Sequence, residues 1–454
     1  MPRPKQLALF EIDAETPSIM DNGSSYFSDP SFAVNKTLPI HRWVPWIAGF
    51  SSSFVRDVLN IFLKSTGAVL DPFSGVGTTL VEAILLGHNA IGFEINPYAA
   101  LACRAKVNAH KISVEELRAE VAKLQAFYRD KGSHGHKPKS TPPQGFRTRS
   151  EFYSPKVLHK VLILQDFIDA IHDSDLRDLF RLAFASTMVR YSNYSYEPSL
   201  GRRVSAGKPE IHDFPVGQTV VSKLLEMAED ITWFQDNLPD DVQDAKVHNT
   251  SFFKHQKYLA PSSVDLVITS PPYLNNYHYN RNTRPQLYWL GYAKRPKDLK
   301  LLEHSNFGKY WQTVRDEDRI DLSFSLPGTD LKERLQTLRE TNPEKGVYGG
   351  NGWANYAASY FNDCHAFSKV LKCVLKPQGS AVVVIGNSIL QGIMIPTDQY
   401  FGRIAESVGL ELIRIEIPRA ERVGNSIIQS DVRVVKAKKS DQLYEAVVEL
   451  RNPA

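Results

Sequence analysis

The segment Val264–Thr269 runs directly into two consecutive prolines, and this transition constrains the fold more than any other feature of the sequence. Its mainly apolar and β-branched residues predict a buried strand. Pro271 and Pro272 lack backbone donors and have fixed φ angles, so strand pairing must stop at Ser270. The sequence therefore predicts a rigid exit from a sheet, with a hydroxyl before the prolines and the aromatic ring of Tyr273 after them.

A strand–turn–helix unit lies far upstream of this exit. Residues 67–79 predict a short apolar strand, a turn that contains Gly75 and Gly77, and the start of a helix. The glycines let backbone approach a ligand, and the helix start offers free N–H groups to an anion. A second strand, 90–94, ends at Glu94, roughly 20 residues past the turn, where doubly wound folds place the acid that binds ribose hydroxyls. An ordinary βαβ unit with a tight turn is the alternative interpretation.

The composition is that of a globular protein of two or three domains, with 454 residues, 42% of them hydrophobic and 23% charged. No apolar run is long enough for a membrane span, and no secretory signal follows Met1, so we expect a cytoplasmic protein without a membrane partner. The three cysteines lack zinc-site or disulfide spacing, so we expect no metal. The net charge of +4 permits a nucleic-acid partner without requiring one.

Taken together, the two motifs resemble those of the amino-methylating DNA methyltransferases. Residues 71–79, Asp-Pro-Phe-Ser-Gly-Val-Gly-Thr-Thr, resemble the first motif of that family. Residues 269–273, Thr-Ser-Pro-Pro-Tyr, resemble its fourth motif in the form typical of N4-cytosine enzymes. The resemblance implies an α/β fold with a doubly wound, mostly parallel, seven-stranded Rossmann-like sheet, and S-adenosyl-L-methionine bound at the carboxyl ends of its central strands.

The same resemblance implies a set of cofactor-binding residues in the first motif and after the second and third strands. They are Asp71, Pro72, Phe73, Gly75, Gly77, Thr78, Thr79, Glu94, Ile95, Asn249 and Ser251. Relatives usually place an aspartate after the third strand, and here Asn249 and Ser251 are the candidates to replace it. Residues 38–51 occupy the place of the family's tenth motif, and their Trp43 and Trp46 fit a cofactor wall and a plain core equally well.

The resemblance also implies that the proline exit binds the nucleobase that is methylated. The exocyclic amine of a nucleobase is a poor nucleophile because its lone pair is delocalised into the ring, so an enzyme must hold the amine in line with the methyl donor. By resemblance, the Ser270 hydroxyl and the Pro271 carbonyl accept hydrogen bonds from this amine, and the rigidity of Pro271 and Pro272 fixes both acceptors. Tyr273 stacks on the base, which is flipped out of the duplex.

We expect the catalytic domain to be interrupted by two inserted regions. The segments are an N-terminal arm 1–30, catalytic parts 31–109, 241–273 and 354–440, a helical insertion 110–240, a target-recognition region 274–353 and a tail 441–454. The remaining strands are predicted at 245–248, 380–386, 410–417 and 431–436, the last two as a closing antiparallel pair.

The candidate DNA contacts lie in both insertions. A loop at 191–204 mixes aromatic residues with arginines, although a solvated polar loop is an equal alternative. The segment after Tyr273 is rich in asparagine and arginine, the side chains that read purine edges in the major groove. The candidates are Arg202, Arg203, Asn275, Asn276, Arg281 and Arg284.

The sequence thus predicts a site-specific DNA methyltransferase that makes N4-methylcytosine in double-stranded DNA, within a restriction–modification or other defence system, with a restriction endonuclease or another defence protein as the candidate partner. N6-adenine methylation is the alternative, because many Ser-Pro-Pro-Tyr enzymes carry the fourth motif before the first, whereas this chain has the reverse order. RNA methylation is a more distant alternative.

The N-terminal arm contains a further resemblance. Gln6-Leu-Ala-Leu-Phe10 is similar to the short peptides that dock bacterial replication proteins on the sliding clamp, in which apolar side chains fill a pocket. The simpler interpretation is that Leu7, Leu9 and Phe10 pack on the protein's own core.

Overall fold

The computed structural model describes residues 26–46, 49–131, 136–196, 199–274, 279–419 and 443–453. Four predictions made from the sequence fall outside these residues: the clamp-like peptide Gln6–Phe10, Asn275, Asn276 and the strand predicted at 431–436. None of the helices in the described ranges is long and apolar enough to cross a membrane.

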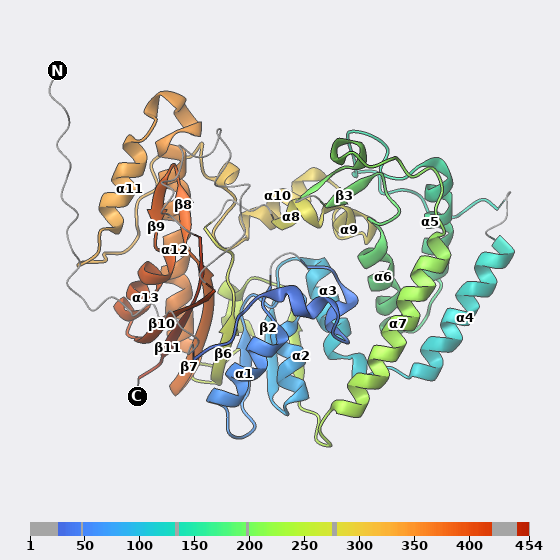
Figure 1. Cartoon of the computed structure of the whole chain (residues 1–454), viewed down its shortest axis with the longest axis horizontal. Coiled ribbons are helices and arrows are strands. Elements are labelled where there is room, and N and C mark those ends of the chain that lie inside the picture. The colour runs from blue at the N-terminus through green and yellow to red at the C-terminus, as the bar shows by residue number, and fades with distance from the viewer. Residues whose placement is uncertain are drawn as a thin grey trace.

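A seven-stranded sheet forms the centre of the molecule (Figure 1). Its strands are β1 (Ala68–Asp71), β2 (Asn89–Phe93), β5 (Ala245–His248), β6 (Val264–Thr269), β7 (Leu375–Gly386), β10 (Glu411–Arg419) and β11 (Glu445–Arg451). They are ordered β10-β11-β7-β6-β1-β2-β5. The first five are parallel to one another, while β11 is antiparallel to both β7 and β10. The predicted doubly wound, mostly parallel α/β fold is confirmed.

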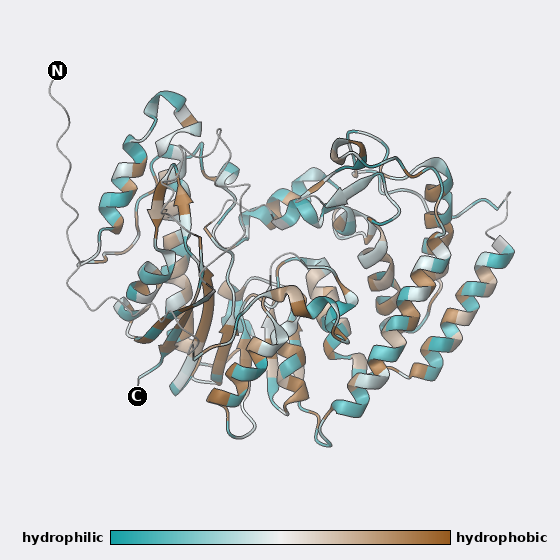
Figure 2. Ribbon diagram, viewed as in Figure 1, coloured by the Kyte–Doolittle hydropathy of each residue, from teal (hydrophilic) through white to brown (hydrophobic). Residues whose placement is uncertain are grey.

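The central strands are buried on both faces, which explains their nearly continuous apolar sequences. Along β1, Val69 belongs to one hydrophobic cluster and Leu70 to the other, and the residues of β6 alternate in the same way. The first face is covered by α1 (Ser52–Phe62), α2 (Thr78–Leu85) and α3 (Pro97–Val107), and the second by α12 (Gly350–Val374) and α13 (Thr397–Ser407) (Figure 2).

The helical insertion packs against the first face. It contains α4 (Val114–Lys131), α5 (Pro155–Asp169), α6 (Ser174–Thr187) and α7 (Val216–Asn237). The short helix η3 (Ala109–Lys111) lies at its start, and η4 (Arg203–Ala206) lies between α6 and α7. The segment predicted as a loop at 191–204 instead contains a small hairpin of β3 (Tyr194–Tyr196) and β4 (Leu200–Arg202). Its alternating polar and aromatic residues suit a two-stranded ribbon.

The region 274–353 is divided between two parts of the molecule. Its first helices, α8 (Tyr279–Asn282), α9 (Arg284–Trp289) and α10 (Pro296–His304), lie beside β3 in Figure 1. Leu287 and Trp289 join the core of the helical insertion. The later elements η6 (Trp311–Thr313), α11 (Leu331–Glu340) and η7 (Pro343–Tyr348) belong to the α12 side, where Trp311 and Leu335 are buried in the second cluster. The first part and the helical insertion therefore form one composite lobe.

The segment 441–454, expected to be a tail, contains β11, and this expectation is corrected. β11 lies between β7 and β10, and its residues Ala446–Leu450 are all buried. A strand buried on both faces lacks strict alternation, so a period-two pattern does not identify it. The remaining elements are η1 (Phe32–Lys36), η2 (His41–Trp43), η5 (Phe252–Lys257) and the hairpin β8 (Ser388–Leu390) with β9 (Ile393–Ile395).

Asp230 on α7 fixes the N-terminal segment that leads to the carboxyl edge of the sheet. Its buried carboxylate accepts from the backbone N–H of Ile40 at 2.9 Å, from the Trp43 indole at 2.9 Å and from the Arg42 guanidinium at 2.6 Å. Trp43 is fully buried, so it is a core residue. These contacts thereby fix the position of the segment that ends at Pro45 and Trp46.

We expect Asp230→Ala to lower the free energy of unfolding by roughly 2–3 kcal/mol, because three donor groups lose one buried acceptor. Denaturant unfolding of the purified chain measures this change. The matched control is Asp236→Ala on the same helix, whose exposed side chain should change stability by less than about 0.5 kcal/mol. Equal effects of the two substitutions would contradict the role of Asp230.

Candidate active site

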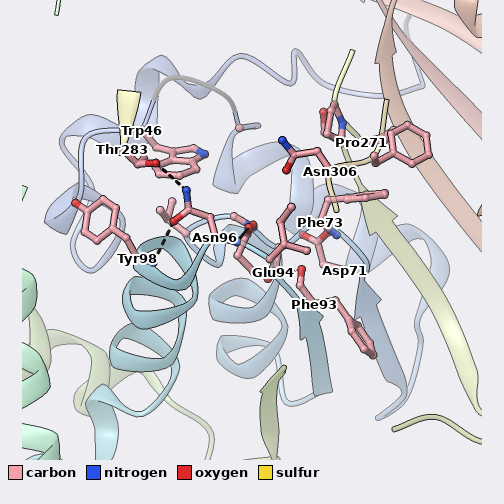
Figure 3. Close-up of a pocket in the computed structure, with 18 of the residues that line it drawn as sticks. Trp46, Asp71, Phe73, Phe93, Glu94, Asn96, Tyr98, Pro271, Thr283 and Asn306 are labelled. Carbon is pink, nitrogen blue, oxygen red and sulfur yellow. Dashed lines mark hydrogen bonds between the residues drawn. The ribbon is translucent and has the colours of Figure 1, made fainter. Parts of the chain in front are cut away.

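A pocket of about 470 Å³ opens at the carboxyl ends of β1, β2 and β6 (Figure 3). The chain passes from β1 outward to β2 and β5, then returns to β6 on the opposite side of β1. The pocket therefore lies at the switch point where doubly wound sheets bind ligands. Most of the predicted cofactor residues line it: Asp71, Pro72, Phe73, Gly75, Thr78, Glu94, Ile95 and Ser251.

Asp71 connects the elements that meet at this switch point. Its Oδ1 accepts from the Thr269 hydroxyl at 2.6 Å and from the backbone N–H of Phe73 at 3.1 Å, and its Oδ2 accepts from the Thr79 hydroxyl at 2.7 Å. Burial raises the pKa of this carboxyl from 3.8 to about 6, although the three hydrogen bonds favour its ionised form. Thr79 faces this carboxylate and does not line the pocket.

The turn after β1 needs its two glycines for different reasons. Gly75 has a φ of +50° and lines the pocket. Gly77 has a φ of +88° and precedes α2, where a Cβ would lie 2.7 Å from the Sγ of Cys103. Left-handed backbone and close packing both favour glycine at this position. Gly77 does not line the pocket. It shapes the turn through its left-handed backbone and its close packing against Cys103.

Glu94 follows β2 and faces the pocket (Figure 3). Its two carboxylate oxygens accept from the backbone N–H groups of Gly75 at 2.9 Å and Asn96 at 2.7 Å. Burial is the main cause that raises its pKa from 4.5 to about 7, against the opposing effect of these bonds. Each oxygen keeps a further lone pair for a ligand hydroxyl.

The two candidates after the third strand occupy different positions. The side-chain amide of Asn249 donates to the carbonyls of Glu94 at 2.7 Å and Ile95 at 3.2 Å, and the residue does not line the pocket. Ser251 lines the pocket together with Phe252. The Asn249 side chain therefore fixes the backbone at Glu94 and Ile95. Ser251 is the one of the two candidates that could contact a ligand in the pocket.

The proline exit forms another part of the same pocket. β6 ends at Thr269 as predicted, and Ser270, Pro271, Pro272 and Tyr273 all line the cavity. The Ser270 hydroxyl donates to the Tyr273 hydroxyl at 3.3 Å, and Tyr273 donates to Glu445 Oε1 at 3.3 Å. The lone pairs of Ser270 Oγ are left to accept from a ligand amine.

Comparison with known proteins agrees with this geometry. A model of the N6/N4 DNA methylase family matches residues 40–103, which contain the Asp71 turn and Glu94. The type II methyltransferase M.BsoBI of Geobacillus stearothermophilus is 26% identical over 87% of this chain and 83% of its own length. The type II methyltransferase M.AvaI of Nostoc sp. is 25% identical over 85% and 82%, and M.MvaI of Kocuria varians is 22% identical over 72% of each chain.

The chain is therefore similar to N6/N4 DNA methylases and to type II DNA methyltransferases. Several residues that line the pocket were not singled out by the sequence. They are Thr283, Gln286, Asn306 and Glu445. Asn280 also lines the pocket, and it belongs to the asparagine- and arginine-rich segment after Tyr273 in which target recognition is predicted. Glu445 comes from β11, some 170 residues beyond the tyrosine that it contacts, and no local motif surrounds it. Trp46 also lines the pocket, which separates it from the buried Trp43.

The predicted DNA-contacting arginines lie outside the pocket, on the composite lobe. Arg202 and Arg281 are exposed. Arg203 donates to the carbonyl of Pro209 at 2.9 Å, and Arg284 donates to the carbonyl of Arg147 at 2.7 Å. The last two side chains thus help to shape the lobe. In the described part of the chain, no cluster of three or more His, Cys, Asp or Glu side chains could hold a metal ion.

The raised pKa of Glu94 predicts a pH dependence of stability. Between pH 4.5 and about 7 the folded methyltransferase retains a proton that the unfolded chain releases, so the contribution of Glu94 to stability falls as the pH rises through this window. Glu94→Gln should therefore flatten the decline in melting temperature over these pH values. The control is Glu116→Gln, at an exposed position on α4. A variant with the wild-type slope would disprove this assignment.

Proposed function

We propose that this methyltransferase transfers a methyl group from S-adenosyl-L-methionine to N4 of a cytosine flipped out of double-stranded DNA. The observation that carries the proposal is that the Asp71 turn, Glu94 and the Ser270–Tyr273 exit all open into one pocket. Such a pocket can hold a methyl donor and an acceptor amine together, and their mutual orientation is the main requirement for the transfer.

The cofactor side of the pocket fits S-adenosyl-L-methionine, the donor that this family generally uses. Glu94 would accept hydrogen bonds from the ribose hydroxyls, since its carboxylate is oriented by Gly75 and Asn96 and retains free lone pairs. Ile95 and Phe252 provide apolar surface for a purine ring, with Ser251 at its edge. When bound, the cofactor supplies an electrophilic methyl group on a sulfonium.

The acceptor side fits an exocyclic amine. We propose that Ser270 Oγ and the Pro271 carbonyl each accept one amino hydrogen, which aims the nitrogen lone pair at the methyl group. Tyr273 would stack on the base, and Glu445 keeps its ring oriented through the phenol hydroxyl. Pro271 and Pro272 limit the motion of both acceptors, so the acceptors lose little conformational entropy when the reactive geometry forms.

The composite lobe is the candidate for reading DNA. Arg202 and Arg281 are exposed on it and suit contacts to phosphates or bases. The side chains of Arg203 and Arg284 donate to backbone carbonyls, so they suit a role in stabilising the lobe. The relatives named above are type II methyltransferases. This supports a role for our protein as the modifying member of a restriction–modification system, with a restriction endonuclease as its partner.

Removal of the Glu94 carboxylate tests the cofactor assignment. We expect Glu94→Ala to weaken binding of S-adenosyl-L-methionine by about 1–3 kcal/mol, because the ribose contact is lost. Since ribose hydroxyls favour the ionised carboxylate, the affinity of the wild-type protein should rise with pH up to about 7 and then level off. Calorimetric titration measures both effects, with Glu116→Ala as the control. Unchanged affinity would show that the turn serves another ligand.

The identity of the methylated base requires a direct assay. The purified protein, given tritiated S-adenosyl-L-methionine and mixed DNA, should label N4 of cytosine. Tyr273→Ala should lower turnover through the loss of stacking worth about 1–3 kcal/mol while cofactor affinity stays near the wild-type value. Label found solely in N6-methyladenine would reject the cytosine assignment, and label found solely in RNA would reject DNA as the substrate.

A further inference from the structure

The side chain of Asn280 on α8 is buried beside the pocket. It is 2% exposed, it belongs to the lining of the cavity, and its Nδ2 has no hydrogen-bond partner among the residues that the structure describes. Buried donors without partners are rare because their desolvation is then uncompensated, and a ligand bound in the cavity can provide the missing acceptor. The unsatisfied amide of Asn280 therefore indicates that the pocket binds a ligand with a hydrogen-bond acceptor.

The backbone around Asn280 is fixed by contacts with both neighbouring parts of the molecule. The Asn282 carbonyl accepts from the Tyr196 hydroxyl at 2.9 Å, and its side-chain oxygen accepts from the Leu200 N–H at 3.0 Å. On the other side, Asn96 at the start of α3 donates to the Thr283 hydroxyl at 2.8 Å, as the dashed line in Figure 3 shows. α8 is thus anchored to the β3–β4 hairpin and to the first βα unit, which keeps Asn280 at the pocket.

A second unsatisfied group lies on the same wall. Gln286 on α9 also lines the pocket, and its buried Oε1 has no partner within the described ranges. Its Nε2 donates to the Tyr196 hydroxyl at 3.2 Å and to the Ala185 carbonyl at 3.4 Å, so the orientation of the amide is set. The two residues of this wall therefore carry one unsatisfied donor and one unsatisfied acceptor, and a nucleobase edge carries groups of both kinds.

The proline exit cannot by itself choose between bases. Ser270 and the Pro271 carbonyl accept from an amine, and cytosine and adenine both have one. Cytosine N3 and adenine N1 are acceptors at equivalent positions beside the amine, but the next ring position carries the acceptor O2 in cytosine and a C–H group in adenine. A donor aimed at O2 would therefore discriminate between the two bases.

We propose that Asn280 supplies this donor, through a hydrogen bond from Nδ2 to O2 of the flipped cytosine, and that it is a specificity-determining residue. This inference rests on the proposed function. It assigns to α8 the reading of the target base itself, a role separate from contacts with the surrounding duplex. A hydrogen bond to a buried group gives strong discrimination because the group is left unsatisfied with the wrong base.

The test compares two variants on three substrates. Asn280→Ala removes the amide, and Asn280→Asp keeps its shape while it replaces the donor with an acceptor. The duplexes carry the methylation site, identified first by modified-base sequencing, with one of three target bases: cytosine, 3-deazacytosine, which lacks the N3 acceptor, or a 2-aminopyridine C-nucleoside, which lacks O2. Asn60→Ala is the control, because Asn60 is exposed on α1, near the end of the helix that precedes β1. Thermal unfolding establishes that each variant is folded.

On cytosine, we expect both Asn280 variants to lower kcat/KM for methyl transfer by about tenfold, the effect of one hydrogen bond. On the 2-aminopyridine C-nucleoside, which lacks O2, the wild-type protein should lose a similar factor and the variants should lose nothing further, whereas on 3-deazacytosine, which keeps O2, the tenfold difference between wild type and variants should remain. The changed reactivity of an analogue's amine cancels in the ratio of wild type to variant. Affinity for S-adenosyl-L-methionine should stay unchanged.

Other results would overturn the proposal. They are an unchanged kcat/KM on cytosine, an equal loss on all three substrates, and a loss of cofactor affinity by the same factor, which would assign the amide to the cofactor. If the wild-type protein labels no cytosine, the proposed function itself fails and this inference fails with it. That outcome is distinguishable because it appears before any variant is compared.

Discussion

The carboxylate of Asp71 is the interaction on which the site depends most. Its hydrogen bonds reach Thr269 at the end of β6 and Thr79 on α2. The two oxygens thus join the strand before the glycine turn, the helix after it and the strand before the proline exit. Because β1 and β6 are neighbours at the topological switch point, one buried side chain links the glycine turn to the proline exit. The hydroxyl donors offset part of the cost of burying the acid.

The opposite wall of the pocket is built by segments that are far apart in the sequence. The Tyr196 hydroxyl on β3 donates to the carbonyl of Asn282, and Gln286 donates to that hydroxyl. These contacts join the helical insertion to the segment after the proline exit. The lobe that carries the exposed arginines and the wall that carries Asn280 are therefore one packed body. If DNA binds to the outside of this lobe as proposed, the contact would be transmitted through packed side chains to the wall of the pocket that carries Asn280.

The sequence predicted those parts of the site that depend on local chemistry. The glycine turn, Glu94 and the proline exit each follow a strand directly, and parallel strands bring their carboxyl ends to one edge. Asn249 was harder to place, because its role depends on the course of the neighbouring Glu94 loop. Asn280 lies in a segment whose composition predicted base recognition, but the composition could not show that this side chain is buried at the pocket. Glu445 carries no local signal, since only the pairing of β11 brings it to Tyr273. β11 was missed for a related reason, because burial on both faces removes the alternation that marks a half-exposed strand.

The position of β11 has a consequence for synthesis of the protein. β11 pairs with β7 along residues 380–386 and with β10 on its other side, although it follows both in the chain. Neither neighbour can complete its pairing until residues 445–451 have left the ribosome. Glu445, the partner of Tyr273, arrives with the same strand. A nascent chain that already contains both sequence motifs therefore still lacks the strand that brings Glu445 to the pocket, so the complete pocket lining depends on a strand that is synthesised after both motifs.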